Sequence, residues 1–174
     1  VSAALFLRRN GMAVTVLEKR ERTFGIVEYV IPAFRIPEET IRLDYEMAVK
    51  TGVEFQFGVQ DVDVEALRSQ YDFVLLAVGA WKPCAPAVDE DKGQEHMLDA
   101  LAFLEESKAN NCKVDLGNRV AVIGGGDVAM DCARAAKRAP GVDSVTLVYR
   151  RTKTVMPAET EEIRLALENG VECG

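Results

Sequence analysis

The sequence predicts an α/β protein built on parallel sheets, because short apolar runs alternate with amphipathic helical segments along its 174 residues. Residues 73–78 and 120–123 contain only apolar side chains, which is typical of strands that are buried on both faces. Between such runs, apolar residues recur at helical spacing, as at Ile41, Tyr45 and Ala48. Strands separated by helices usually pair in parallel, so we expect parallel sheets that helices cover on both faces.

The first half of the chain opens with a helix. Small residues from Ser2 onward lead into an apolar and basic helical pattern, which Asn10 and Gly11 stop. Pro37 begins a second helix, which Gly52 ends. The other elements expected here are strands at residues 13–17, 54–57 and 73–78, a helix at residues 62–70, and an irregular segment at residues 23–34.

A carboxylate stands at the tip of the first predicted strand, where residues 13–17 end on Glu18. In a dinucleotide-binding βαβ unit, an acidic residue at this point accepts a hydrogen bond from the 2′-hydroxyl of the adenosine ribose. The opening of the chain therefore predicts the back half of such a unit.

A second strand–helix–strand unit follows a connector. Residues 81–94 carry prolines and acidic residues, and residues 98–109 predict a helix. A strand at residues 120–123 then leads into a helix that runs to about Arg138, and a further strand follows at residues 144–148. Between the first of these strands and the helix, the pattern G-x-G-x-x-A is formed by Gly124, Gly125, Gly126, Asp127, Val128 and Ala129.

This glycine loop predicts nucleotide binding. Its glycines permit a tight turn and let backbone N–H groups approach a pyrophosphate, while Ala129 keeps the helix close to the sheet. The alternative is a tight turn with a purely structural role. Because a strand precedes the motif and a helix follows it, we favour a Rossmann-like dinucleotide-binding lobe.

The strand tip of the second unit differs from that of the first. Arg150 and Arg151 stand where the first unit has Glu18. A carboxylate suits the free ribose diol of FAD or NAD, whereas two guanidinium groups suit the 2′-phosphate of NADPH. The alternative is that both arginines are solvated surface charges. Two such units in one chain indicate a flavoprotein that NADPH reduces.

Composition excludes other classes of function. The net charge of −7 argues against a nucleic-acid partner. No apolar run approaches the roughly 20 residues of a membrane helix, and no signal-peptide pattern is present, so we expect no membrane partner and a cytoplasmic location. Apolar residues make up 48% and charged residues 28% of the chain, as is usual for a globular protein.

The cysteines and the histidine offer no metal or hydrolase site. Four cysteines are scattered without a C-x-x-C pair, so we expect reduced, mostly buried thiols and no metal bound by this chain. The single histidine, His96, lies in a polar connector, and no G-x-S-x-G motif accompanies it.

Three segments resemble one family. EKRERTFGIVEYVIPAFRIP is similar to the flavin loop of the glutamate synthase small-subunit family, and YDFVLLAVGAWKP and VAVIGGGDVAMDCARAAKRAPGVDSVTLVYRR with VMPAETEE resemble later parts of that family. IPAFRIP and RAPGVDSVTLVYRR most resemble its branch of selenate reductase subunits. The resemblance implies that NADPH passes hydride to FAD. It also implies that electrons leave through iron–sulfur clusters in a separate domain or a large catalytic subunit.

The resemblance also implies roles for individual residues. Hydride transfer needs stacking and orientation, so no catalytic residue is singled out. The NADPH pyrophosphate would lie on the glycine loop, the 2′-phosphate on the two arginines, and the nicotinamide side near residues 156–159. On the flavin side, the resemblance places Glu18 and Lys19 at the adenosine ribose, Gly25 and Ile26 near the flavin, Arg35 near FAD, Val59 and Asp61 beside the adenine, and Ala77 and Gly79 under the cofactor.

In that family a glycine loop runs directly into the residues that match Val1–Ala4, so we expect a chain truncated at both ends. The expected parts are a partial FAD domain at residues 1–84, a connector with a helix at 85–117, and a partial NADPH domain at 118–174. Without its first strand, the FAD domain would leave residues 73–78 without a neighbour and would bind FAD poorly. A non-catalytic module that binds an adenine dinucleotide is the alternative function.

Overall fold

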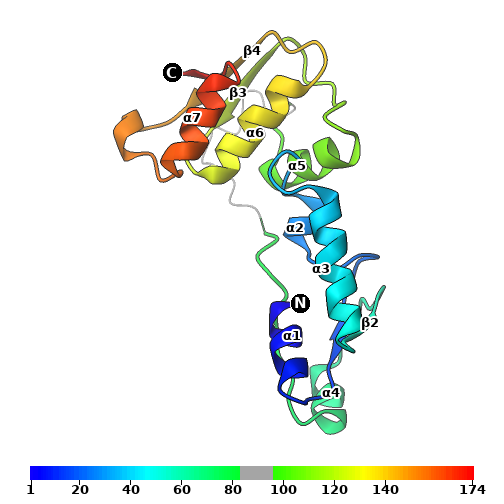
Figure 1. Cartoon of the computed structure of the whole chain (residues 1–174). Helices are drawn as coiled ribbons and strands as arrows, with labels where there is room; N and C mark the ends of the chain where they lie inside the picture. The colour runs from blue at the N-terminus through cyan, green and yellow to red at the C-terminus, as the bar shows by residue number, and fades with distance from the viewer. Residues whose placement is uncertain (83–95) are drawn as a thin grey trace. The chain divides into compact units, whose positions relative to one another are not determined.

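The computed structural model describes residues 1–82 and 96–174 (Figure 1). The chain divides into two compact units. Unit 1 consists of Val1–Tyr29 and Ile36–Ala80, and unit 2 of Val30–Arg35 and Trp81–Gly174. The expected boundary between residues 84 and 85 lies outside the described residues.

Unit 1 is built around two parallel strands. β1 (Thr15–Leu17) pairs with β2 (Glu54–Gln56) in register from Thr15 opposite Glu54. Helices α1 (Ser2–Arg9), α2 (Ile26–Tyr29), α3 (Glu38–Lys50) and α4 (Val64–Gln70) complete the unit. The aromatic rings of Tyr45 on α3 and Phe55 on β2 lie 5.2 Å apart, so this helix packs on the strand that follows it.

One prediction for unit 1 is wrong. Residues 73–78 form no strand, and Phe73 and Val78 are 83% and 79% exposed. A strand becomes stable only when a neighbour satisfies its backbone groups and covers its side chains. The sheet of β1 and β2 does not include this run, so its apolar composition alone does not bury it. The exposure expected for a run without a neighbouring strand is therefore observed.

Unit 2 contains a three-stranded parallel sheet in the order β3-β4-β5. These strands are β3 (Arg119–Ile123), β4 (Ser144–Val148) and β5 (Glu172–Cys173). The helices are α5 (Ala100–Ala109), α6 (Asp127–Arg138) and α7 (Thr160–Glu168), with a 3₁₀ turn at Lys153–Val155. Each strand is thus separated from the next by a helix, which is the βαβ arrangement that the sequence predicts.

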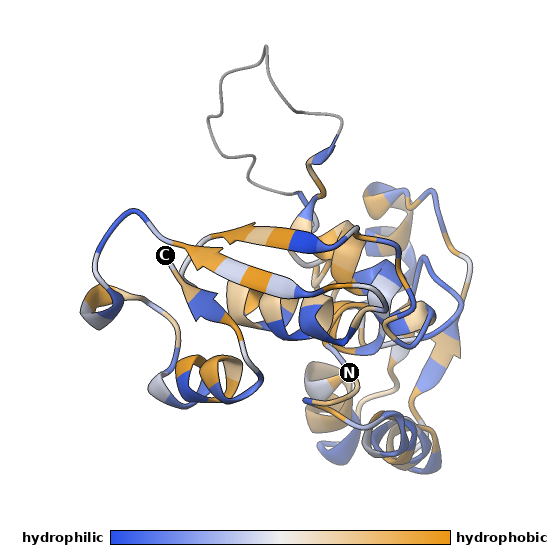
Figure 2. Ribbon diagram, turned by 90° about the horizontal axis from the view of Figure 1, so that it is seen from above, coloured by the Kyte–Doolittle hydropathy of each residue, from blue (hydrophilic) through white to orange (hydrophobic). Residues whose placement is uncertain are grey.

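The core of unit 2 lies between the sheet and α6. Val145 and Leu147 of β4 and Met130 of α6 are almost completely buried. All residues of α6 from Met130 to Ala136 are buried, and the small alanines at positions 133, 135 and 136 let the surrounding elements lie close to the helix. Figure 2 looks onto this sheet with α6 behind it.

The opposite face of this sheet is not covered by the described residues. Exposed and partly buried residues alternate along β3, and Ile123 is 62% exposed. The expectation that helices cover both faces is therefore wrong for the part of the chain that the structure describes. The sequence supplies helices for one side of a βαβαβ unit, because right-handed crossovers place successive helices on the same face.

The cysteines only partly follow the prediction. Cys132 is buried, Cys112 is half-buried and Cys173 is exposed, and all three are free thiols. The expectation of a buried thiol is confirmed for Cys132 and wrong for Cys112 and Cys173, and Cys84 lies outside the described residues. Burial raises the pKa of the Cys132 thiol to about 12, so it stays protonated. Among residues 1–82 and 96–174, no helix has the length and apolarity needed to span a membrane.

Candidate dinucleotide-binding site

The glycine loop connects β3 to α6 in a tight turn. Gly124 has a φ of +147°, and its N–H donates to the carbonyl oxygen of Val148 at 3.0 Å. A Cβ placed on Gly124 would lie only 3.1 Å from the Cβ of Ala129. The close approach of helix and strand that the motif predicts is therefore present.

The first turn of α6 faces open space beside the loop. Gly126 is the residue before the helix, and a Cβ placed on it would meet no atom within 4 Å. Asp127 and Val128 follow in the first helical turn, where backbone N–H groups have no partner within the helix. Together with the positive end of the helix dipole, these groups form a surface that suits a phosphate.

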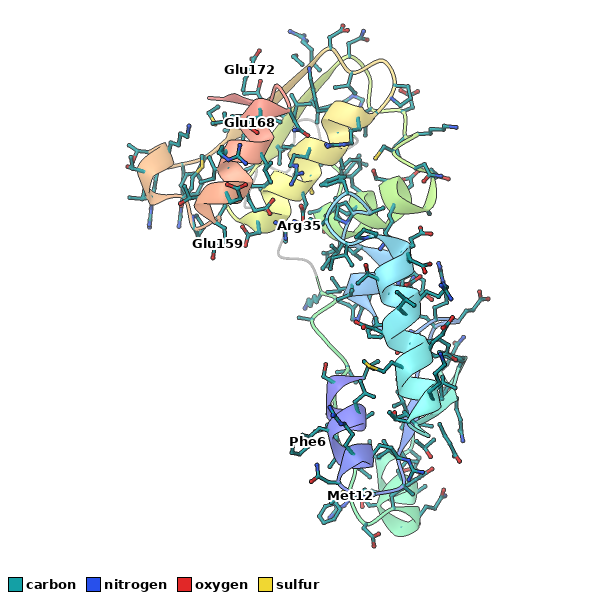
Figure 3. The ribbon with its side chains drawn as sticks, in the orientation of Figure 1. Phe6, Met12, Arg35, Glu159, Glu168 and Glu172 are labelled. Carbon is teal, nitrogen blue, oxygen red and sulfur yellow. The ribbon has the colours of Figure 1, made fainter. Side chains whose placement is uncertain are left out.

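Residues 156–159 lie directly against this loop. The N–H of Ala158 donates to the carbonyl oxygen of Gly125 at 3.0 Å, and the N–H of Glu159 donates to Oδ1 of Asp127 at 3.0 Å. Figure 3 labels Glu159, which stands at the start of α7. The sequence analysis identified both the glycine loop and residues 156–159, but no sequence pattern indicated that these two segments are hydrogen-bonded to each other.

The two arginines emerge from the same edge of the sheet as the glycine loop. Ile123 at the end of β3 is paired with Val148 at the end of β4, so the loops that follow both strands start side by side. Arg150 and Arg151 are exposed, and neither forms an ion pair with another described residue. Both guanidinium groups are thus available to an anionic ligand at this edge.

Tyr149, which the sequence analysis did not single out, lies between the loop and the arginines. A Cβ placed on Gly125 would lie 2.7 Å from Cδ2 of the Tyr149 ring. The ring therefore covers Gly125 closely. In the sequence, only its position next to Arg150 pointed to Tyr149. Its contact with Gly125 joins residues that are distant in the chain, so no local pattern predicts it.

In unit 1, part of the predicted FAD site comes together at the ends of β1 and β2. Oε1 of Glu18 accepts a hydrogen bond from the N–H of Arg20 at 2.9 Å, and the N–H of Val59 donates to the carbonyl oxygen of Glu18 at 3.1 Å. Glu18 and Val59 are therefore neighbours at the carboxyl edge of the small sheet, where nucleotides bind in such folds. Lys19 and Asp61 are exposed.

Other predicted FAD residues are not gathered at this edge. Gly25 has a φ of +53° and immediately precedes α2, which begins at Ile26. Ala77 and Gly79 belong to the exposed segment after α4 and form no strand pairing. The described structure therefore brings Glu18 and Val59 together. Ala77 is not part of the sheet at whose edge these two residues lie.

Arg35 belongs to a cluster of charged residues in unit 2 (Figure 3). Its Nε lies 2.8 Å from Oδ1 of Asp131, and its Nη2 lies 2.8 Å from Oε1 of Glu162. Arg134 joins them, with its Nη1 3.0 Å from Oε2 of Glu162. Burial raises the pKa of Asp131 to about 6, although the positive charge of Arg35 opposes this rise.

The segment before Arg35 is held by the same helix. The ring of Phe34 lies 4.5 Å from the guanidinium carbon of Arg134 and 4.2 Å from that of Arg138. The guanidinium of Arg35, which the resemblance places near FAD, is thus engaged by carboxylates of α6 and α7. Nothing in the spacing of the sequence predicted these partners.

The parallel sheets, the glycine loop and the charged strand tips define a nucleotide-binding α/β protein of the oxidoreductase type. The chain belongs to the pyridine nucleotide-disulphide oxidoreductase family, whose sequence profile matches residues 1–173. The predicted fold class and the predicted kinship with glutamate synthase small chains are confirmed.

Relatives in other organisms agree with this assignment. The Escherichia coli O157:H7 protein YgfK, which is named as an oxidoreductase, is 41% identical over 99% of this chain and 17% of its own length. The glutamate synthase [NADPH] small chain of Escherichia coli K12 is 32% identical over 99% of this chain and 39% of its own length. The chain thus spans less than half of either relative.

Among solved structures, FprA from Mycobacterium tuberculosis in complex with NADPH matches with a TM-score of 0.76. It is 22% identical, and the match covers 96% of this chain and 44% of FprA. At this identity the likeness concerns the fold.

Proposed function

We propose that this chain is the dinucleotide-binding part of an NADPH-dependent flavin oxidoreductase of the glutamate synthase small-subunit type. The observation that carries the proposal is the common sheet edge from which both the glycine loop and the segment with Arg150 and Arg151 start. A phosphate-binding loop beside two arginines without described partners matches a dinucleotide that carries an additional 2′-phosphate.

The residues of unit 2 fit this nucleotide. Open space beside Gly126 leaves room for a pyrophosphate at the first turn of α6. The backbone from Gly124 to Val128 would hold the pyrophosphate, and Arg150 and Arg151 would hold the 2′-phosphate. Residues 156–159, which are hydrogen-bonded to the loop, would lie on the nicotinamide side, as the family resemblance implies.

Unit 1 would hold the adenosine end of FAD. Glu18 and Lys19 would bind its ribose, with Val59 and Asp61 beside the adenine and Gly25 and Ile26 nearer the flavin. Arg35, Ala77 and Gly79 complete the proposed set. A flavin held by these residues would supply a hydride acceptor for NADPH and a source of single electrons.

We propose that the electrons pass to iron–sulfur clusters in another domain or in a large catalytic subunit. The names of the relatives support a subunit that passes electrons from NADPH to another subunit. They include the NADPH-dependent glutamate synthase small chain and, in Moorella thermoacetica, the beta subunit of an NADP(+)-dependent formate dehydrogenase. Their greater length leaves room for the further domains that such a path needs.

The test is to measure flavin reduction by NADPH and by NADH in the full-length protein, purified with its flavin. We expect a yellow protein that NADPH reduces faster at equal concentration. Faster reduction by NADH would overturn the assignment of Arg150 and Arg151. A colourless protein that still binds NADPH would favour the alternative, a binding module without turnover.

A further inference from the structure

We infer that Tyr149 is a positioning residue for cofactor selectivity, because it fixes the arginine loop to the glycine loop. This inference rests on the proposed function of the site and deepens it. The arginine loop is defined as residues 150–158, which follow β4 and include Arg150 and Arg151.

The ring of Tyr149 packs on the middle glycine of the loop. A Cβ on Gly125 would lie 2.7 Å from Cδ2, 2.8 Å from Cε2 and 3.0 Å from Cγ of Tyr149. Gly125 is buried, and its φ is not in the left-handed region. Backbone conformation therefore does not require a glycine at this position, and the G-x-G-x-x-A pattern leaves this position free. The tyrosine ring supplies the reason for a glycine here.

The arginine loop is attached to Gly125 at both of its ends. Tyr149 precedes it and covers Gly125 with its ring, while the N–H of Ala158 at its other end donates to the Gly125 carbonyl oxygen at 3.0 Å. The Tyr149 hydroxyl also lies 3.4 Å from the carbonyl oxygen of Val155 and donates to it. One glycine residue is thus the anchor for the whole loop.

The arginines depend on this anchor because no hydrogen bond or ion pair with another described residue holds their side chains. Arg150 and Arg151 are exposed, so the backbone that follows Tyr149 largely decides where their guanidinium groups lie. An exposed arginine gains affinity for a phosphate only when little flexibility is lost on binding. Loss of the ring should therefore weaken 2′-phosphate binding more than binding of the rest of the nucleotide.

The experiment compares two ligands on the full-length, flavin-loaded protein by calorimetry: adenosine 2′,5′-bisphosphate, which carries the 2′-phosphate, and 5′-AMP, which lacks it. For Tyr149→Ala we expect about tenfold weaker binding of the bisphosphate and a change of at most about twofold for 5′-AMP. Tyr149→Phe keeps the ring and should stay within about threefold for both ligands. Tyr71→Ala, at an exposed tyrosine of unit 1, is the matched control and should change neither.

Gly125→Ala tests the same contact from the other side. Its added Cβ should displace the ring and lower bisphosphate affinity much as Tyr149→Ala does, whereas in a Tyr149→Ala background it should add little, because the space is then free. The comparison is made on variants whose circular dichroism spectra match that of the wild-type protein.

The outcomes separate the two claims. An equal loss for both ligands in Tyr149→Ala, or additive losses in the double variant, would overturn the role of Tyr149 while leaving the proposed function intact. A wild-type protein that binds both ligands equally would overturn the proposed NADPH function, and the inference with it.

Discussion

The two units differ in how many neighbouring strands flank each strand of their sheets. In unit 2, β4 is flanked by β3 and β5, and Val145 and Leu147 are buried to 0% and 1% exposure. In unit 1, β1 pairs with β2 alone, and all three of its residues are only partly buried. The strand that leads into the glycine loop is thus also one of the two that enclose β4. The binding loop and the core of unit 2 therefore depend on the same element.

The difference in packing between the two units is tested most strongly by truncating one leucine in each unit. Leu147→Ala removes a buried side chain at the centre of the sheet and should cost about 2–5 kcal/mol in the free energy of unfolding. Leu75→Ala, at a residue that is 66% exposed, should change it by less than about 0.5 kcal/mol. Denaturant unfolding followed by circular dichroism measures both. Similar losses would show that the two units are packed alike.

The contrast between the strand tips can be tested through cofactor affinity. Replacing both Arg150 and Arg151 with alanine should cost roughly 2–4 kcal/mol of NADPH affinity, because charge-assisted contacts to the 2′-phosphate are lost. NADH affinity should stay nearly constant. Arg164→Ala, which removes an exposed arginine of α7, is the control and should affect neither cofactor. Fluorescence titration gives both affinities, and an equal loss for NADH would contradict the phosphate assignment.

The charged cluster around Asp131 should make the stability of unit 2 depend on pH. The pKa of Asp131 is raised from 3.8 to about 6, so the folded state holds this proton more tightly than the unfolded state does. The stabilising contribution is therefore complete below about pH 4 and is lost as the pH rises through about 6.

The positive charges of Arg35 and Arg134 partly offset the cost of burying the Asp131 carboxylate. We therefore expect the free energy of unfolding to fall by about 1–2 kcal/mol across this range. Asp131→Asn should flatten the profile, since Asp127 and Glu162, the other acidic groups near the site, are unchanged. Urea unfolding at a series of pH values measures the slope. Equal slopes in the two proteins would assign the dependence to other groups.

The smallest effect concerns two helix caps. Oδ1 of Asp99 accepts the N–H of Ala102 at the start of α5, and Oδ1 of Asp63 accepts the N–H of Glu65 at the start of α4. α5 buries Phe103 and Leu104, whereas α4 has no buried residue.

Asp99→Ala should therefore lower the stability of unit 2 by about 1 kcal/mol, while Asp63→Ala should affect only the local opening of α4. Hydrogen exchange of the two helices distinguishes these results. A global loss of protection in Asp63→Ala would show that α4 is integrated into the core of its unit.

How much the sequence could predict follows the same division. The strand, loop and helix at residues 119–138 were predictable because an apolar run and the spacing of glycines are local signals. The strand at 73–78 was predicted wrongly from its apolar composition, because a strand also needs a neighbouring strand, and only the family resemblance indicated that this neighbour is missing. The contacts of Tyr149 with Gly125 and of Arg35 with Glu162 join residues far apart in the chain, so no local pattern could predict them.

The exposed run at residues 73–78 has a consequence for handling the protein. Its six residues carry no charge and no proline, and its aromatic and branched side chains favour extended structure. Segments of this composition stack into cross-β assemblies when they are accessible in concentrated solution. Aggregation of this chain should therefore begin at this run and increase steeply with protein concentration. A single lysine in place of Leu75 should delay it, since repeated like charges oppose stacking.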